Sequence, residues 1–214
     1  MSPVLDAILA LLLLTNLRLL GASRLHACIR TVAWQAVLLG ALPLVADGPV
    51  TLRVAILAVA STGLKALVLP WLLRRAVRQA NVQREVEPLL GFTTSLLVGV
   101  GLLGAAVHLA SRLPPPGHAN SAFLVPVALL TIMVGLLVIV SRVTAIMQVL
   151  GYLAMENGIY AFGMAFAVAE PMLVEMGVLL DVFVAVLVMG ITIGQISREF
   201  DHIDTDRLSS LKDV

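Results

Sequence analysis

Long apolar stretches separated by short polar segments run through most of this chain. Their apolar residues follow one another without the alternation of a half-buried strand, and about 20 such residues in a helix cross the hydrocarbon core of a bilayer. Because a spanning segment must satisfy its own backbone hydrogen bonds in lipid, helices are expected. The pattern predicts seven of them, over residues 3–22, 27–46, 50–73, 89–111, 122–141, 145–167 and 171–196.

The composition supports a membrane protein. Hydrophobic residues make up 60% of the 214 residues and charged residues 13%, which leaves too little polar surface to coat a soluble domain. The net charge of +1 provides no basic surface for nucleic acid. A single cysteine excludes an internal disulfide and a cysteine-ligated cluster within the chain. We therefore predict an all-α, polytopic membrane protein.

The basic residues are divided unequally between the two sides of the predicted bundle. The loops of one side carry only Arg112. Because the more basic side of a membrane protein faces the cytoplasm, the pattern predicts an external N-terminus and a cytoplasmic C-terminus. The basic residues of the predicted cytoplasmic side are Arg24, Arg74, Arg75, Arg78, Arg84, Arg142, Arg198, Arg207 and Lys212.

A proline-rich connection divides the chain. The segment RLPPPGHANS (112–121) predicts a stiff external link, so we separate helices 1–4 (residues 1–113) from helices 5–7 (114–196) and a polar cytoplasmic tail (197–214). The basic loop 73–88 is either a topology anchor with a short surface helix or a docking site for a soluble partner.

Three acidic residues fall inside the last two predicted helices. Glu156 lies near the middle of 145–167, and Asp181 near the middle of 171–196, with Glu175 closer to the outer end of the same helix. A charge at the centre of a spanning helix costs roughly 2.5–3.5 kcal/mol on insertion scales, so such residues usually serve ion or proton handling. The more specific hypothesis is that these acids form a proton relay. The alternative is that the acids are permanently protonated or paired with a neighbouring subunit.

Three further polar residues are candidates to support such a relay. Asn157 and Gln148 share the predicted helix of Glu156. Lys65 lies inside 50–73, and Pro70 one turn later removes a backbone donor and predicts a kink. The Lys65 side chain either snorkels to the interface or forms an ion pair with an acid of this or another subunit.

No catalytic motif is present. The sequence lacks a phosphate-binding glycine loop, a nucleophile triad arrangement and histidines at metal-ligand spacing. We therefore expect no catalytic, cofactor or metal site in this chain.

The last third of the chain has a recognisable combination of motifs. It contains MENGIYAFG around Glu156, VEMGVLLDVFVAVLVMGI around Glu175 and Asp181, and the tail REFDHIDTDRLSSLK. This combination resembles the hydrogenase-4 component E family, membrane subunits of complex I-related assemblies such as formate hydrogenlyases. In that family the last three helices are similar to the small K subunit of complex I and to the C subunit of multisubunit cation/proton antiporters. The resemblance matches Glu156 to the first embedded glutamate of those subunits and leaves the second open between Glu175 and Asp181.

The resemblance also implies partners and a location. The partners are antiporter-like membrane subunits, a membrane protein similar to the quinone-module H subunit of complex I, and a peripheral oxidoreductase arm that holds iron–sulfur clusters and possible nickel–iron chemistry. The location is the cytoplasmic membrane of a bacterium or archaeon. On this hypothesis the chain is a non-catalytic subunit whose buried acids translocate protons coupled to electron transfer. The alternatives are a scaffold that joins antiporter-like modules without conducting protons, and a stand-alone secondary transporter.

Overall fold

The computed structural model describes residues 3–45, 59, 62–79, 89–113 and 121–166, and the regular secondary structure in this part of the chain is helical. The elements, in chain order, are α1 (Pro3–Gly21), α2 (Leu25–Val45), the π-helical turn η1 (Leu64–Val68), α4 (Leu69–Gln79), α5 (Phe92–Ala110), α6 (Leu124–Ser141) and α7 (Ala145–Phe166).

Five predicted helices agree closely with α1, α2, α5, α6 and α7. Four of these, α1, α2, α5 and α6, contain stretches long and apolar enough to cross a membrane. The fifth, α7, has 22 residues and is not among these four; its sequence includes Gln148, Glu156 and Asn157. The described part is thus an all-helical membrane protein. The seventh predicted helix, 171–196, lies outside the described residues.

The predicted end of the third helix at residue 73 is wrong. The helix continues as α4 to Gln79, through Arg74 and Arg75. The physical reason is amphipathicity: Leu73 and Val77 are buried while both arginines are exposed, so the charged residues lie on the outer face of a helix and not in a loop. Residues 50–58 and 60–61 of that prediction lie outside the described part.

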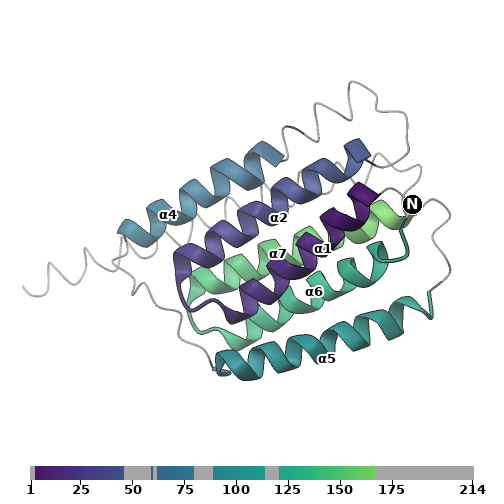
Figure 1. Cartoon of the computed structure of the whole chain (residues 1–214). Helices are drawn as coiled ribbons and strands as arrows, with labels where there is room; N and C mark the ends of the chain where they lie inside the picture. The colour runs from purple at the N-terminus through teal and green to yellow at the C-terminus, as the bar shows by residue number, and fades with distance from the viewer. Residues whose placement is uncertain (1–2, 46–58, 60–61, 80–88, 114–120, 167–214) are drawn as a thin grey trace, which may run out of the picture.

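The helices form a bundle of roughly parallel and antiparallel rods, with α4 and α5 at opposite edges (Figure 1). Helix α7 packs against α6 and α2, and α1 packs against α2, α5 and α6. The turn η1 joins α4 to the bundle through α2.

Glycines allow α6 and α7 to approach backbone to backbone. A Cβ atom added at Gly151 would lie 2.8 Å from the carbonyl oxygen of Gly135 and 2.9 Å from the backbone nitrogen of Ile139. One added at Gly158 would lie 2.6 Å from the backbone nitrogen of Ile132. Small residues at such positions are the usual means of close helix packing in membranes, and they hold α7 in place.

The interior has a polar layer between two apolar clusters. One cluster contains Leu19, Leu25, Leu73, Val138 and Leu150, and the other contains residues nearer the opposite ends of the same bundle, such as Leu5, Leu42, Leu124 and Ala165. Between them lie the six residues of the polar layer, Asn16, Gln35, Lys65, Thr131, Glu156 and Asn157.

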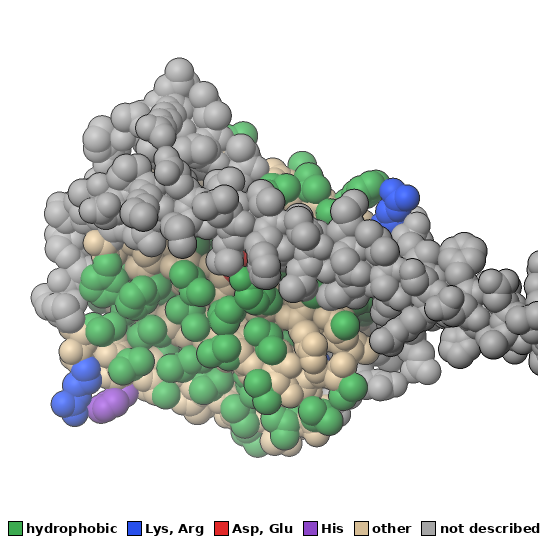
Figure 2. Space-filling model, turned by 180° about the vertical axis from the view of Figure 1, so that it is seen from behind, with side chains coloured by type: hydrophobic (Ala, Val, Ile, Leu, Met, Phe, Trp, Pro, Cys, Tyr) green, Lys and Arg blue, Asp and Glu red, His purple; other side chains and the backbone are tan. Residues whose placement is uncertain are grey.

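The surface is apolar, as expected for contact with lipid or with membrane partners. Figure 2 shows hydrophobic side chains across the described part of one face, with Lys and Arg side chains at its margins. Exposed apolar residues include Leu14, Leu97, Val100 and Val140. Such a surface would be unstable in water.

Candidate functional site

Glu156 lies in the interior of the bundle at about mid-depth. It follows the first residue of α7 by eleven positions, which is roughly 16 Å along a helix, and it is 3% exposed. Its helix is fixed in place by the glycine contacts with α6. A carboxyl group at this depth needs a partner, because an isolated charge is costly to bury.

Lys65 is placed by an irregular turn of its own helix. In η1 the backbone N–H of Leu69 donates to the carbonyl oxygen of Leu64, a bond from residue i+5 to residue i. The cause lies in Pro70, which has no N–H to donate and whose ring would clash with the carbonyl one turn earlier. A π turn accommodates the proline without interrupting the helix. The expected kink is therefore a π turn, and Lys65 lies within it.

The turn brings Lys65 to Glu156. The Nζ atom of Lys65 donates to Oε1 of Glu156 at 2.8 Å, and the two side chains are 10% and 3% exposed. The ammonium also lies 5.9 Å from the ring centroid of Tyr160, within the range of a cation–π interaction. Of the two alternatives for Lys65, the structure shows the ion pair, and its partner is in the same chain.

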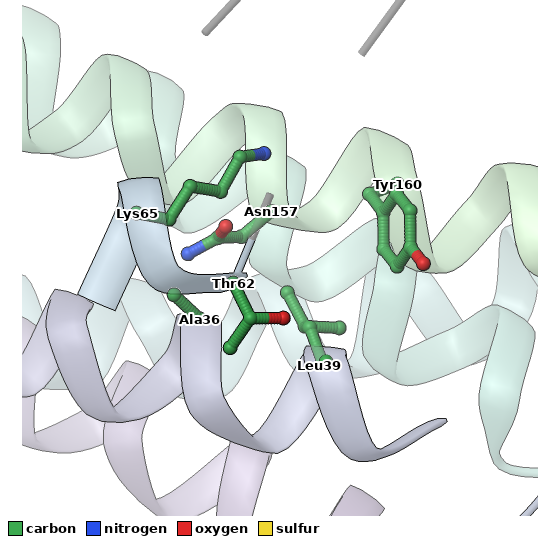
Figure 3. Close-up of a pocket in the computed structure, with 7 residues that line it drawn as sticks. Ala36, Leu39, Thr62, Lys65, Asn157 and Tyr160 are labelled. Atoms are coloured by element: carbon green, nitrogen blue, oxygen red, sulfur yellow. The ribbon is translucent and has the colours of Figure 1, made fainter. Parts of the chain in front are cut away.

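A small cavity adjoins the ion pair (Figure 3). It is partly open and offers about 20 Å³ to water, and since a cavity needs roughly 10–15 Å³ to hold a water molecule, there is room for one. The side chain of Asn157 faces this space, and its Nδ2 atom is buried without a hydrogen-bond partner in the described part of the chain. The lining residues are Ala36, Leu39, Gly40, Thr62, Lys65, Asn157 and Tyr160.

The other candidate residues are not all at this site. Gln148 is exposed on α7, eight residues before Glu156, so it does not belong to the buried pair. Glu175 and Asp181 lie outside the described residues. Among the residues that the structure does describe, no three His, Cys, Asp or Glu side chains are grouped as metal ligands.

A buried chain of hydrogen bonds connects α2, α1 and α6. Gln35 Nε2 donates to Asn16 Oδ1 at 2.9 Å, Asn16 Nδ2 donates to Thr131 Oγ1 at 2.7 Å, and the Thr131 hydroxyl donates to the Val127 carbonyl. The order of donors fixes the orientation of both amides. Sequence reasoning did not identify this chain, although a lone amide in the middle of an apolar span, as at Gln35, was the signal available.

Arg142 lies in the turn between α6 and α7, as the sequence predicts, but it is buried there, with 1% of its surface exposed. Its Nη2 donates to the carbonyl oxygen of Leu20 at 2.9 Å, and its guanidinium lies 5.0 Å from the ring centroid of Phe92. Burial lowers the pKa of the Arg142 guanidinium. The residue ties the turn between α6 and α7 to the end of α1 and the start of α5.

Comparison with known proteins gives two kinds of relative. The chain is 36% identical over 206 residues to the protein named Uncharacterized protein Rv0085 from Mycobacterium tuberculosis, covering 94% of this chain and 93% of that protein. It is 32% identical over 150 residues to Hydrogenase-4 component E of Escherichia coli K12, covering 69% of this chain and 68% of that protein. The protein of the same name from Shigella flexneri gives the same values.

No family model matches the sequence. No solved structure matches it either. The identity to Hydrogenase-4 component E nevertheless extends over two thirds of both chains. The chain belongs to the hydrogenase-4 component E family, as a distant member.

Proposed function

We propose that this chain is a membrane subunit of a complex I-like hydrogenase assembly and that the Lys65–Glu156 pair takes part in proton translocation. The observation that carries the proposal is the buried ion pair at mid-depth, 2.8 Å between Nζ and Oε1. Family membership supports it, since the relative's name places that protein in a hydrogenase. Electron transfer takes place in partner subunits, and this chain supplies titratable groups.

The chemistry follows from the coupling of two charges in a medium of low dielectric. While Lys65 contacts Glu156, the ammonium stabilises the carboxylate and disfavours its protonation. If Lys65 moves away, the buried carboxylate loses its counter-ion and takes up a proton. The return of Lys65 then expels that proton. A movement driven by a partner subunit would in this way be converted into proton uptake and release.

The second relay acid is proposed to be Glu175 or Asp181, on the helix expected over 171–196. Asn157 would support the relay as a hydrogen-bond donor. The proposed partners are antiporter-like membrane subunits, a membrane protein similar to the quinone-module H subunit of complex I, and a peripheral arm with iron–sulfur and possible nickel–iron centres, as in formate hydrogenlyases. No redox cofactor is proposed for this chain.

The proposed topology has seven spans, an external N-terminus and a cytoplasmic C-terminus in the cytoplasmic membrane of a bacterium or archaeon. Support comes from the position of the described arginines. The hydrogen bond from Arg142 to Leu20 brings the α6–α7 turn to the same end as the α1–α2 turn, which carries Arg24. Phe92, the first residue of α5, lies at that arginine-bearing end. Arg112 follows the last residue of α5 and therefore lies at the opposite end of the bundle.

A scaffold function is the second candidate, and the ion pair itself favours it. A pair that never separates would neutralise two buried charges and hold η1 against α7 without moving protons. The scaffold and the relay differ only in whether Glu156 changes its protonation during turnover.

The test is the variant Glu156→Gln in the intact complex. The amide keeps the size of the side chain and an acceptor for Lys65 but removes the titrating proton. We expect the complex to assemble and electron transfer to continue while proton uptake by membrane vesicles is lost. Gln148→Ala, on the exposed face of the same helix, is the matched control and should leave uptake unchanged. Assembly with wild-type proton uptake in Glu156→Gln would exclude the relay and favour the scaffold.

A further inference from the structure

The packing differs on the two sides of the Lys65–Glu156 pair. Helices α2 and α7 both begin at the arginine-bearing end, with Leu25 and Ala145 as their first residues. Residues of α2 and α7 that precede Ala36 and Glu156 therefore lie toward that end, whereas later residues lie toward the opposite end. In the chain segment of Lys65 the direction is reversed, because α4 runs back toward the arginine-bearing end.

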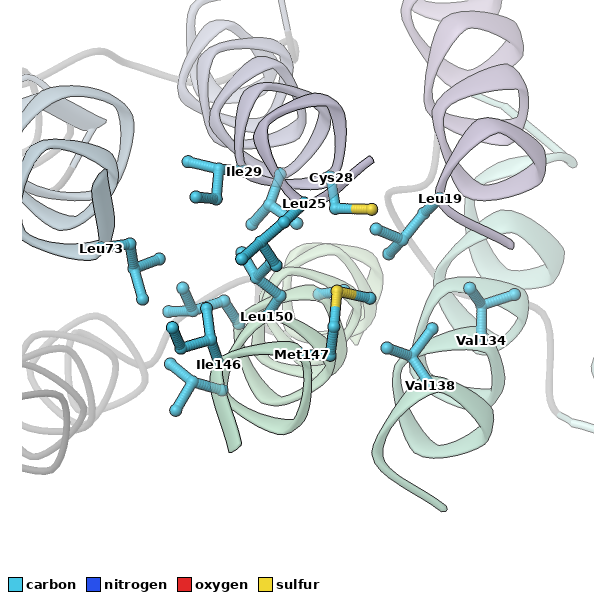
Figure 4. Close-up of a cluster of buried hydrophobic side chains, with 14 of the residues drawn as sticks. Leu19, Leu25, Cys28, Ile29, Leu73, Val134, Val138, Ile146, Met147 and Leu150 are labelled. Atoms are coloured by element: carbon cyan, nitrogen blue, oxygen red, sulfur yellow. The ribbon is translucent and has the colours of Figure 1, made fainter. Parts of the chain in front are cut away.

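Toward the arginine-bearing end the interior is closed by apolar side chains. Ile29, Leu69, Leu73, Ile146 and Leu150 form part of one cluster, and each is at most 3% exposed. Figure 4 shows Ile29, Leu73, Ile146 and Leu150 pointing into the space between α2, α4 and α7. Leu150 precedes Glu156 by six residues, roughly 9 Å along the helix. We name these five residues the apolar seal.

Toward the opposite end the pair borders the cavity. Thr62 precedes Lys65, and Tyr160 follows Glu156, so both lining residues lie beyond the pair on the side away from the arginines. The apolar cluster at that end joins α1, α2, α6 and α7, and within the described part its members do not include residues 62–77. Leu39 belongs to both this cluster and the lining of the cavity, and Tyr160 packs against the cluster, so the cavity lies at its edge, between α2, Thr62 and α7.

The cavity is suited to water. It offers about 20 Å³, enough for one molecule. The Nδ2 atom of Asn157 is buried with no acceptor in the described part of the chain, and a buried donor without an acceptor costs roughly 1–3 kcal/mol. A water molecule in the cavity would accept from Asn157 and remove this cost. The hydroxyl groups of Thr62 and Tyr160 belong to the same lining.

We infer that water reaches the Lys65–Glu156 pair from one face only. The route is the cavity, on the face opposite the arginine-bearing turns, and the apolar seal closes the other face. Asn157 is the positioning residue that holds water beside the pair. This inference deepens the proposed function and rests on it for the use of the route, whereas the route itself is measurable without turnover.

Silver ions, which are small and bind thiolates, test the route in membrane vesicles that contain the assembled complex. The native cysteine is first removed by Cys28→Ser. Thr62→Cys then reports on the cavity and Leu73→Cys on the apolar seal. Ser23→Cys and Ser111→Cys, at exposed positions near the two ends of the bundle, identify which vesicle face is which. After exposure to silver, the complex is denatured and treated with a maleimide. A thiol that has bound silver is protected from the maleimide, so the loss of labelling measures the reaction with silver.

Thr62→Cys should react several-fold faster from the Ser111 face than from the Ser23 face, and Leu73→Cys should be slow from both. Reaction of Thr62→Cys that is equal from both faces, or faster from the Ser23 face, would overturn the inference. So would a reaction of Leu73→Cys as fast as that of Thr62→Cys.

Hydroxyl-radical footprinting of the unmodified complex gives a second measurement that needs no cysteine. Tyr160, which lines the cavity, should be oxidised, whereas Met147, buried in the cluster of the seal, should stay protected although methionine is intrinsically the more reactive residue. Asn157→Leu should lower Tyr160 oxidation several-fold. Oxidation of Met147 equal to that of Tyr160 would contradict the seal, and unchanged Tyr160 oxidation in Asn157→Leu would contradict the role of Asn157.

The outcomes separate this inference from the proposed function. A complex in which Glu156→Gln still translocates protons but Thr62→Cys reacts from the Ser111 face alone would remove the relay and keep the one-sided route. A complex that loses translocation in Glu156→Gln but in which silver reaches Thr62→Cys from the Ser23 face would keep the relay and remove the one-sided route.

Discussion

At the scale of single residues, the site depends on a lysine that is held inside the bundle by a neighbouring proline. Pro70 imposes the π turn, and the π turn brings Lys65 to Glu156 at 2.8 Å. Neither charge would be stable alone in this interior, because removal of one member of a buried pair typically costs about 3–5 kcal/mol. The two residues are therefore expected to behave as one unit.

A double-mutant cycle tests whether Lys65 and Glu156 are energetically coupled. Lys65→Met and Glu156→Gln should each lower the heat stability of the purified complex, and the double variant should be more stable than the sum of the two losses predicts. We expect an interaction energy of about 1–3 kcal/mol from the midpoints of heat dissociation. Additive losses would mean that the pair contributes no coupling in the complex.

Glu156 could be identified from the sequence, but its contact with Lys65 could not. Glu156 stands out because a carboxyl group in the middle of an apolar span is rare. Lys65 was recognised as embedded, but its partner is 91 positions away along the chain, and helical periodicity carries no information on contacts at that separation. The amides of Asn16 and Gln35 were overlooked for the same reason, since their hydrogen bonds cross between helices.

At the scale of elements, the glycine contacts between α6 and α7 set the position of Glu156. The two helices meet at Gly135, Gly151 and Gly158, where a methyl group would contact the backbone of the other helix. Any separation of the two helices would move Glu156 relative to Lys65, because Glu156 lies between Gly151 and Gly158 on α7.

Gly151→Ala should therefore weaken both packing and proton translocation. Overpacking at a close contact typically costs about 1–3 kcal/mol. The matched control is Gly101→Ala, since a Cβ atom there meets no atom within 4 Å and alanine is the better helix former. The measurement is the heat stability of the complex together with proton uptake. Equal effects of the two substitutions would show that the α6–α7 contact does not set the site.

The bounds of most helices were predictable because apolar runs of the right length end at polar residues. Helix α7, predicted over 145–167, is found at Ala145–Phe166. The third helix continues beyond residue 73, into the segment 73–88 for which a topology anchor with a short surface helix was one of two alternatives. In α4 the arginines occupy the exposed face, and Arg75 lies 5.6 Å from the ring centroid of Trp71, so one helix includes both the end of the predicted span and the arginines that follow it.

At the scale of the whole molecule, the bundle has two different ends. Arg142 ties three helix ends together at one of them through Leu20 and Phe92, and the polar layer with its cavity lies between that end and the other. Membrane proteins retain their basic residues on the cytoplasmic side. An arginine-bearing end, a half closed by apolar side chains and a half with a small cavity suit the proposed exchange of protons with one face at a time.

The topology is open to a direct test. A reporter that is active only in the cytoplasm, fused after Val214, should be active, and the same reporter inserted at Ser111 should be inactive. The insertion at Ser23 should behave like the C-terminal fusion, since an even number of predicted spans separates these two positions. A silent C-terminal fusion with an active insertion at Ser111 would invert the proposed orientation and the face assigned to every group in the bundle.

On the proposed function, Glu156 gains and loses a proton while the complex turns over. Infrared difference spectroscopy of the intact complex, between its resting and reduced states, measures this most directly. We expect a carboxylic C=O band that shifts in D₂O, is absent in Glu156→Gln and is retained in Gln148→Ala. A difference spectrum of Glu156→Gln that keeps every carboxylic band of the wild type would contradict the claim and leave the Lys65–Glu156 pair as a structural contact.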